Sequence, residues 1–400
     1  MANTKTEISP KWQRVNKEEF EKDKIERPSL TYWQDAWRRL KKNKLSMFGL
    51  CLVIIITLMA IFAPMFSRYS YEDQKLEFVN LPPKLDVYKV DDSNYFHLTK
   101  EYTLISVARD GELVGSLKEV EDNKIKRYKK YEIDGNEIIL DYSFAKQAAR
   151  SKDPNAKKYE IRLNGEEITI DKTMKNKSYI LGTDHLGRDL FIRIVYGARI
   201  SLFVAFVATL VNFFIGVFYG GISGYIGGKV DNIMMRIVDI ISTVPLLLIV
   251  ILLSVYLGNG IKTIIIAFGL VYWVRMARLV RGQILSLKEQ EFVLAAKTVG
   301  ASTWRILAKH LIPNAMGPII VSMTMMIPSA IFTESFLSFI GLGVSAPQAS
   351  WGTIASEALQ SLWTSPYQLI YPSIAICITI LSFNFLGDGL RDALDPRLRK

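Results

Sequence analysis

The chain contains 400 residues, half of them hydrophobic, and carries a formal net charge of +11. Several apolar runs approach the length of about 20 residues that a helix needs to cross a bilayer, and they lack the polar face of a soluble core helix. The pattern excludes an ordinary soluble protein and predicts an all-α polytopic membrane protein. Basic residues gather at the ends of the runs and not on one face of a domain, so no nucleic-acid partner is expected.

Residues 1–45 are predicted to form a cytoplasmic N-terminal segment. Residues 1–30 are highly charged and poor in large apolar side chains, which is typical of a chain without fixed structure. The stretch 31–45 is predicted to be an amphipathic helix, with Trp33 and Trp37 at the membrane interface and basic residues facing anionic lipid headgroups. The alternative is a solvated, charged lead-in.

The first membrane span is expected at residues 46–66, where the run 47–66 carries no charge. It follows a long polar segment, and no small-residue cleavage pattern comes after Phe66, so it is not a cleavable signal peptide. Cys51 and Cys377 lie inside apolar runs and the chain has three histidines, so neither a disulfide nor a metal site is predicted.

Residues 67–180 are predicted to form an extracytoplasmic, β-rich insert. Short stretches of alternating apolar residues are separated by Asp110-Gly111, Asp134-Gly135 and Asn164-Gly165, dipeptides that favour two-residue hairpin turns. The segments 129–141 (KKYEIDGNEIILD) and 157–171 (KKYEIRLNGEEITID) resemble each other. We therefore expect related hairpins in this insert.

Residues 181–400 are predicted to form a helical membrane core. Its apolar runs are 200–219, 240–257, 261–274 (extended towards Leu279), 316–332 and 369–386, which with the first run gives six spans. Gly216, Gly220, Gly221 and Gly224 are spaced so that the second span can approach a neighbouring helix closely. Pro245, Pro328 and Pro372 lie within runs and can bend them.

A polar loop at residues 275–313 separates the fourth and fifth spans. Small Ala295 and Ala296 would let a partner approach a short helix, Gly300 would end or bend it, and Pro313 would mark the restart of the next helix.

Charge predicts the orientation of the chain in the membrane. Residues 67–198 hold 23 basic and 23 acidic residues, so the excess of positive charge lies before the first span, in the 275–313 loop and at the C-terminus. Basic residues near span ends stay on the cytoplasmic side. With six spans, both termini and the loop fall together in the cytoplasm.

Five motifs together carry a resemblance to a known family. They are WRRLKKNK at 37–44, LGTDHLGRD at 181–189 with GARISL at 197–202, the loop around Ala295-Ala296 and Gly300, ESFLSFIGLG at 334–343 with Pro347 and Trp351-Gly352, and GDGLRDALDPR at 387–397. The chain resembles the C-type permease subunit of oligopeptide and dipeptide ATP-binding-cassette importers over residues 31–66 and 180–400. That resemblance implies a type I importer permease core in a bacterial cell membrane.

The resemblance implies a non-catalytic subunit that works with partners. These would be a homologous permease, two cytoplasmic ATPase subunits and an extracytoplasmic substrate-binding lipoprotein, beside membrane lipids. The chain holds no phosphate-binding G-x-x-x-x-G-K-[S/T] loop, so no cofactor is expected and ATP would be bound by the partner ATPases. The residues expected to couple this chain to the ATPases are Glu291, Ala295, Ala296, Gly300, Ala301, Arg305 and Pro313, the last of which marks the restart of the next helix.

Two features depart from the family pattern. Leu294 stands where the namesake acid of the loop is usual, with Glu291 one turn earlier, which puts the salt link made there by relatives in doubt. The insert at 67–180 is longer than the pattern requires. We favour the insert as a docking surface for the substrate-binding protein, with contact to the partner permease as the alternative.

Glu334 is an acidic residue near the end of the fifth span, where a charge facing lipid would be costly. One hypothesis places it in the translocation pathway, where it would meet the positive N-terminus of a peptide. The competing interpretation, a structural hydrogen bond to a neighbouring helix, is favoured.

Other functions remain open at this stage. A closely similar permease could import nickel chelates or other small solutes, because the binding protein largely sets selectivity. A passive channel or carrier would not be expected to carry the coupling loop, and the sequence shows no inverted repeat or pair of broken spans. A receptor with an extracellular binding domain would not explain motifs outside the insert.

Overall fold

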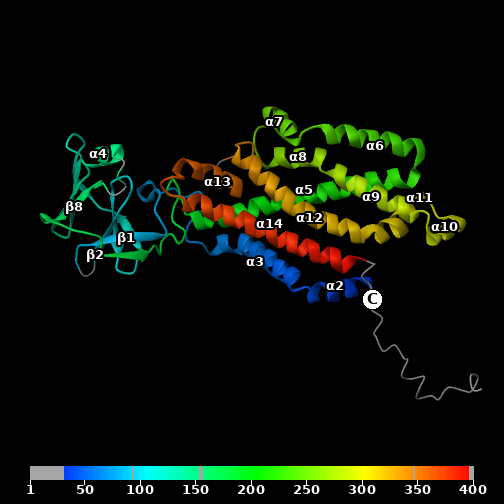
Figure 1. The fold of residues 1–400 in the computed structure, drawn as a ribbon, viewed down its shortest axis with the longest axis horizontal. Helices are drawn as coiled ribbons and strands as arrows, with labels where there is room; N and C mark the ends of the chain where they lie inside the picture. The colour runs from blue at the N-terminus through cyan, green and yellow to red at the C-terminus, as the bar shows by residue number, and fades with distance from the viewer. Residues whose placement is uncertain (1–30, 92–93, 152, 154–155, 346, 396–400) are drawn as a thin grey trace, which may run out of the picture.

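The computed structural model describes residues 31–395 apart from 92, 93, 152, 154, 155 and 346. The predictions for residues 1–30 and for the last residues of the chain lie outside this range. A β-rich insert forms one end of an elongated molecule, and a bundle of long helices forms the rest (Figure 1).

Two helices open the described chain. Helix α2 (Tyr32–Lys42) begins with a capping box between Thr31 and Gln34, and α3 (Lys44–Phe66) is the first long apolar helix. Asn43 ends α2 and caps α3 through its side chain, so the predicted amphipathic helix stops three residues earlier than expected. Trp33 and Trp37 are exposed on α2, as an interfacial helix requires.

The insert contains two antiparallel five-stranded sheets, with strand orders β10-β1-β2-β3-β4 and β5-β6-β7-β8-β9. The strands are β1 (Lys84–Lys89), β2 (Asn94–Leu98), β3 (Leu104–Ala108), β4 (Leu113–Ser116), β5 (Glu119–Asn123), β6 (Tyr128–Ile133), β7 (Asn136–Asp141), β8 (Glu160–Leu163), β9 (Glu166–Glu167) and β10 (Lys172–Lys175). A short helix α4 (Ala145–Arg150) connects β7 to β8, and the one-turn η2 (Leu76–Phe78) precedes β1.

The repeated segments of the insert form neighbouring hairpins, β6–β7 and β8–β9. Asp134-Gly135 and Asn164-Gly165 form their turns with positive φ at both residues, the signature of a type I′ turn. The prediction of related hairpins in a β-rich insert is therefore confirmed. Buried Tyr88, Phe96 and Leu104 from one sheet pack with Tyr131, Ile138, Leu140 and Ile161 from the other.

The remaining chain is almost entirely helical. Its elements are α5 (Leu190–Ile226), α6 (Gly228–Thr243), α7 (Leu246–Leu257), α8 (Ile261–Val271), α9 (Trp273–Leu287), α10 (Glu291–Thr298), α11 (Thr303–Ile306), the π-helical η3 (Leu307–Leu311), α12 (Ile312–Phe339), α13 (Trp351–Ala358), η4 (Leu359–Ser361) and α14 (Tyr367–Leu394).

The predicted count of six spans is not confirmed. Five helices in the described part of the chain are long and apolar enough to cross a membrane. The third expected span, 240–257, is divided between α6 and α7, which meet at an angle of 79°. Pro245 lacks the N–H that would continue α6, and it holds Val244 in an extended conformation, so the helix breaks there.

The glycines of α5 allow close packing against α9. A Cβ added at Gly216 would lie 2.5 Å from the Met276 side chain, and one at Gly220 would lie 2.3 Å from the Ala277 carbonyl oxygen. At Gly224 the nearest atom is the Arg281 carbonyl oxygen, at 2.9 Å. These contacts confirm the predicted close approach, while Gly221 faces Leu307 at an ordinary distance.

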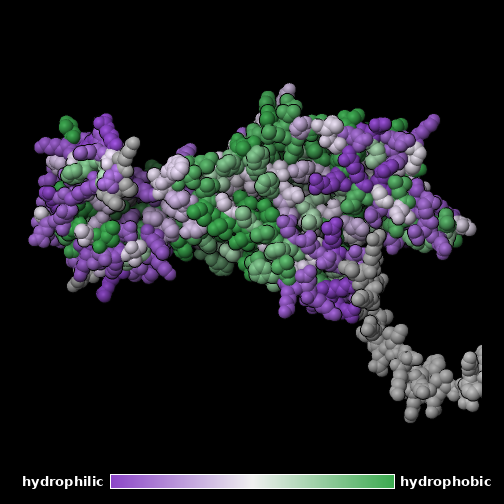
Figure 2. Space-filling model, in the orientation of Figure 1, coloured by the Kyte–Doolittle hydropathy of each residue, from purple (hydrophilic) through white to green (hydrophobic). Residues whose placement is uncertain are grey.

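Hydrophobic surface forms a band across the middle of the molecule, between the hydrophilic insert and the hydrophilic end that carries α2, α6 and α10 (Figure 2). Exposed apolar side chains of α3, α5, α7 and α14 contribute to such surface. Such an extensive exposed hydrophobic surface is expected where lipid or another membrane subunit covers it. The long axis of the bundle therefore runs across the bilayer.

Candidate functional site

The predicted coupling loop forms a helical hairpin at the end of the molecule opposite the insert (Figure 1). Glu291 is the first residue of α10, where its negative charge suits the positive end of the helix dipole. Gly300 follows α10 with φ of +82°, and the Ala301 N–H donates to the Ala296 carbonyl over 3.0 Å. This is a Schellman-type ending, which requires a residue that tolerates positive φ.

The second half of the hairpin differs from the prediction. Ser302 caps α11 by accepting a hydrogen bond from the Arg305 N–H, and helical structure then continues through η3 into α12. Pro313 therefore lies within a helix that has already restarted at Thr303. Pro313 cannot donate a backbone hydrogen bond, and the π-helical turn directly before it accommodates this break in the helical pattern. Asn314 Nδ2 separately donates a 2.6 Å hydrogen bond to the His310 carbonyl.

Five of the seven predicted loop residues are exposed: Glu291, Ala295, Gly300, Arg305 and Pro313. The other two, Ala296 and Ala301, are partly buried and pack against the apolar cluster that contains Val293 and Ile306. The structure thus directs these two alanines towards the membrane domain, and the sequence pattern did not reveal which face of α10 is free.

Several apolar side chains on the hairpin are exposed, which the sequence pattern did not predict. Leu294 is 50% exposed and Val299 is 88% exposed, and Phe292 and Trp304 are exposed as well. Leu294 replaces the acid that is usual at this position of the loop, and its exposure makes this face more apolar. An apolar, solvent-exposed face on a short helix at the hydrophilic end of a membrane protein is typical of a protein-docking surface.

The hairpin is fixed to the membrane helices. Val293 is fully buried among residues of α5, α9 and α12, Lys297 Nζ lies 5.7 Å from the Tyr225 ring centroid, and Trp304 stacks on Phe218. Displacement of α10 would therefore be transmitted to α5.

Helix α6 is bound to α9 close to the same end. Arg281 makes two 2.6 Å hydrogen bonds to the Asp231 carboxylate, and Arg278 contacts Asp239 at 2.9 Å. Asp239 lies within α6. Paired bidentate geometry makes the Arg281 contact the stronger of the two links.

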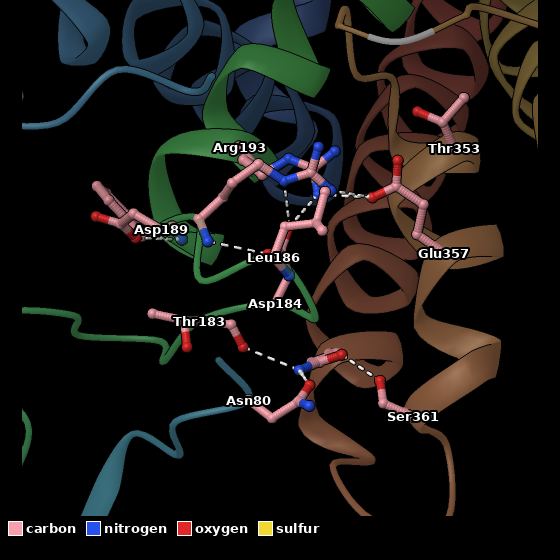
Figure 3. Close-up of polar contacts among 12 residues, drawn as sticks. Asn80, Thr183, Asp184, Leu186, Asp189, Arg193, Thr353, Glu357 and Ser361 are labelled. Carbon is pink, nitrogen blue, oxygen red and sulfur yellow. Dashed lines mark hydrogen bonds and ion pairs between the residues drawn. The ribbon is translucent and has the colours of Figure 1, made fainter. Parts of the chain in front are cut away.

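A second polar cluster lies at the opposite end of the bundle, next to the insert (Figure 3). Asp184 Oδ2 accepts hydrogen bonds from Arg188 Nε at 2.6 Å and Arg193 Nη1 at 2.5 Å. Both arginines also contact Glu357 Oε2, at 2.6 and 2.8 Å. Burial of the Asp184 carboxyl opposes ionisation, but Arg193 and Arg188 outweigh it and hold its pKa below the usual value.

Neutral groups extend this cluster into the insert. Gln368 at the start of α14 donates to the Thr183 carbonyl and to Asn80 Oδ1, both at 2.9 Å, and Tyr367 donates to the Leu81 carbonyl at 2.8 Å. The LGTDHLGRD motif therefore joins the insert to α5, α13 and α14. In the sequence this motif indicates the family resemblance, but not this structural role.

Side chains of types that can bind metals also meet here, which the spacing of these residues in the sequence did not predict. Asp184, His185 and Glu357 present ligand atoms within 4.8 Å of one another. The carboxylates of Asp184 and Glu357 already bind two guanidinium groups, those of Arg188 and Arg193. The positive charge of these groups opposes the binding of a cation. We assign the group as an ion-pair cluster.

Glu334 is completely buried between α12 and α5. Ser201 donates to one carboxylate oxygen and Ser338 to the other, each over 2.7 Å. The Ser201 contact is an interhelical hydrogen bond, the interpretation favoured from the sequence, whereas Ser338 lies on α12 itself. Within the described chain, Glu334 does not face open space.

The sequence matches two family models. Residues 192–400 match the model described as "Binding-protein-dependent transport system inner membrane component", and residues 31–83 match "N-terminal TM domain of oligopeptide transport permease C".

Similar proteins include two from Bacillus subtilis. The "Oligopeptide transport system permease protein OppC" is 42% identical, covering 94% of each chain. The "Dipeptide transport system permease protein DppC" is 40% identical, covering 98% of this chain and 95% of the relative. A solved structure titled "Inward facing conformations of the MetNI methionine ABC transporter" aligns with a TM-score of 0.43 at 19% identity, over 52% of this chain and 96% of the other.

Proposed function

Because the chain belongs to the family of binding-protein-dependent transport system inner membrane components, we propose that it forms half of the translocation pathway of an ATP-driven peptide importer. A homologous permease would supply the other half. Two ATPase subunits would bind ATP and dock at α10, and a substrate-binding lipoprotein would deliver peptide on the side of the insert. The chain itself would carry no cofactor.

The observation that carries this proposal is the exposed face of α10. This face lies at the hydrophilic end remote from the insert, while the opposite face of α10 is anchored among the membrane helices. A force applied to α10 would reach α5 through Val293 and the Lys297–Tyr225 contact. Leu294, Ala295 and Val299 would form the centre of the docking surface, with Glu291 and Arg305 at its rim.

Orientation follows from the same arrangement. The described chain ends are held together by a 3.2 Å hydrogen bond from the Tyr32 hydroxyl to the Leu394 carbonyl, in the half of the molecule that carries α10. Basic residues Lys41, Lys42 and Arg391 accompany them. This supports a cell-membrane protein with both termini in the cytoplasm and the insert outside.

Peptides are the proposed cargo because the relatives that match almost the whole chain are named as oligopeptide and dipeptide permeases. A cell that lacks other peptide importers should take up labelled peptides only when this chain and its partners are present. Uptake of peptide that does not depend on this chain would refute the assignment.

The test of coupling is co-purification with the neighbouring permease and ATPase subunits. Leu294→Arg combined with Ala295→Arg places two charges at the proposed contact and should remove the ATPases while the permease pair stays together. Asn232→Arg, at an exposed position of α6 near the same end, is the matched control and should retain them. ATPases that bind the double variant as well as the wild type would refute docking at α10.

A further inference from the structure

A cavity of about 730 Å³ lies where the insert meets the N-terminal part of α14. Its size is that of a small-molecule site. Apolar groups form one part of its wall, and lysines from the insert form another. The residues that carry the argument are Pro82, Ile180, Tyr371, Lys84, Lys175 and Lys177.

Two of these lysines face each other across the sheet. Lys84 begins β1 and Lys175 ends β10, and the two residues are directly opposite in the antiparallel register. Both are exposed, and neither makes an ion pair within the described residues. Like charges directly opposite on neighbouring strands repel each other, so this arrangement favours an anion between them.

Acidic neighbours do not neutralise this pair. Asp86 lies two residues along the same strand, where its carboxylate accepts a 2.7 Å hydrogen bond from the Thr173 hydroxyl, and within the described residues it forms no ion pair with Lys84 or Lys175. Asp110 binds Lys177 at 3.0 Å. The described lining of the cavity contains no acidic residue, so the charges of Lys84 and Lys175 are available to a ligand.

The apolar side of the cavity continues into the hydrophobic surface of the bundle. Ile180 is 65% exposed at the rim, and Tyr371 lies in the outer part of α14, with exposed Ile374 one turn further along the helix. A ligand held here would have its charged group at the insert and its apolar part along α14. A free phosphate would leave this apolar surface uncovered.

We propose that this cavity binds the phosphate headgroup of an anionic phospholipid on the side of the membrane that carries the insert. The Lys84 and Lys175 ammonium groups contact the phosphate, and an acyl chain lies against Ile180 and α14. The bound lipid would relieve the repulsion between the two lysines and tie the insert to the bilayer.

The test compares the full chain, purified with its partner permease, in nanodiscs of phosphatidylcholine alone or with phosphatidylglycerol. The variant is Lys84→Gln with Lys175→Gln. The control is Lys124→Gln with Lys126→Gln, which removes the same charge from the exposed β5–β6 turn of the other sheet. Native mass spectrometry counts the phosphatidylglycerol that stays bound, and thermal unfolding is followed in each lipid.

Wild type and control should retain phosphatidylglycerol about 25-fold more than the variant, since each of the two juxtamembrane lysines contributes roughly a factor of five to binding of anionic lipid. Phosphatidylglycerol should raise the unfolding temperature of wild type and control but not of the variant. In phosphatidylcholine alone the variant should be at least as stable as wild type, because the repulsion is gone.

Three results would overturn the proposal. Equal lipid retention by variant and wild type would show that the lysines do not bind lipid. Equal stabilisation by glycerol phosphate and by phosphatidylglycerol would indicate a free-anion site. Loss of substrate-binding-protein association with unchanged lipid retention would indicate a protein-docking surface. Neither lipid readout depends on ATPase coupling, so the coupling test is independent.

Discussion

Asp184 is a single carboxylate that binds two arginines and the backbone of its own turn. Its oxygens bind Arg188, Arg193 and the backbone N–H groups of Leu186 and Arg188. Arg193 is 1% exposed, so loss of this counter-charge leaves a guanidinium group with only Glu357 to balance it. Removing one partner of a buried pair is strongly destabilising.

Asp184→Asn should lower the free energy of unfolding by about 3 kcal/mol, because the buried arginines lose most of their compensation. Thermal unfolding in detergent measures the change. Asp110→Asn, which breaks the exposed contact with Lys177, is the control and should have little effect. An unfolding temperature equal to wild type in Asp184→Asn would show that Glu357 alone neutralises the cluster.

The same carboxylate gives a pH dependence with a definite sign. The pKa of Asp184 in the folded chain is below its ordinary value of 3.8. Its stabilising contribution is therefore fully present above the unfolded pKa and is lost as the pH falls through the folded pKa. Wild type should lose stability more steeply than Asp184→Asn below about pH 4, as followed by thermal unfolding. Parallel profiles would contradict this assignment.

A substitution of Glu334 tests whether this buried acid stabilises the fold or takes part in transport. Glu334→Gln keeps the shape and one carbonyl acceptor for the serine hydroxyls, so we expect an unchanged KM for peptide uptake and a loss of stability of about 1–2 kcal/mol. Peptide uptake kinetics and thermal unfolding provide the two readouts. A KM that rises several-fold at unchanged protein level would restore the pathway hypothesis.

At the scale of elements, the contact between α5 and α9 depends on missing side chains. Gly220→Ala would place a methyl group 2.3 Å from a backbone oxygen, which cannot move without shifting α9. Gly221→Ala, one position on, would meet Leu307 at 3.9 Å, an ordinary contact. The two substitutions make the same chemical change on different faces of one helix.

Gly220→Ala should destabilise the protein by about 1–3 kcal/mol through overpacking. Gly221→Ala should be neutral or stabilising by up to about 1 kcal/mol, because alanine favours helix more than glycine. Thermal unfolding of the two variants in the same detergent gives the comparison. Equal stabilities would mean that α9 moves freely away from α5.

Short sequence patterns predicted which helices and turns form better than they predicted the direction in which the chain then runs. The Asp134-Gly135 and Asn164-Gly165 turns follow from backbone sterics within two residues, so the sequence indicates them directly. Hydropathy, in contrast, identified 240–257 as one run, although Pro245 turns the chain by 79° there. A pattern of apolar residues indicates the length of a segment but not its direction, which is why the count of six spans is not confirmed.

The candidate docking surface shows the same limit. Small residues and Gly300 located the hairpin, but Ala296 turned inward and Leu294 outward because tertiary packing of Val293 fixes the rotation of α10. The ion-pair cluster could not be predicted from the sequence either, since Asp184 and Glu357 are 173 residues apart in the chain. The local spacing of residues encodes neither the rotation of α10 nor the contacts of the ion-pair cluster.

At the scale of the whole molecule, the proposed functions are separated along one axis. The insert and the ion-pair cluster lie at one end of the bundle, and α10 lies at the other (Figure 1). Long helices, above all α5 with 37 residues, connect the two ends. A helix of that length spans about 55 Å at a rise of 1.5 Å per residue, enough to link both sides of a bilayer.

The chain enters and leaves most of the insert at one point, because Lys84 and Lys175 are paired. Residues 85–174 can therefore be replaced by Asn-Gly, which closes a two-residue hairpin between those lysines. The segments around Leu81 and Thr183 that bind α14 stay in place. If the insert docks the substrate-binding protein, this variant should retain the ATPases in co-purification but lose association with that protein and peptide uptake.

Removing these strands also uncovers one side of Phe78 and Tyr179, so a modest fall in unfolding temperature is expected. Retained ATPases establish that the shortened chain is folded at the α10 end, and the uptake result can then be interpreted. Unchanged peptide uptake with unchanged binding-protein association would refute docking at the insert. Loss of the ATPases as well would mean that the two ends of the molecule do not act independently.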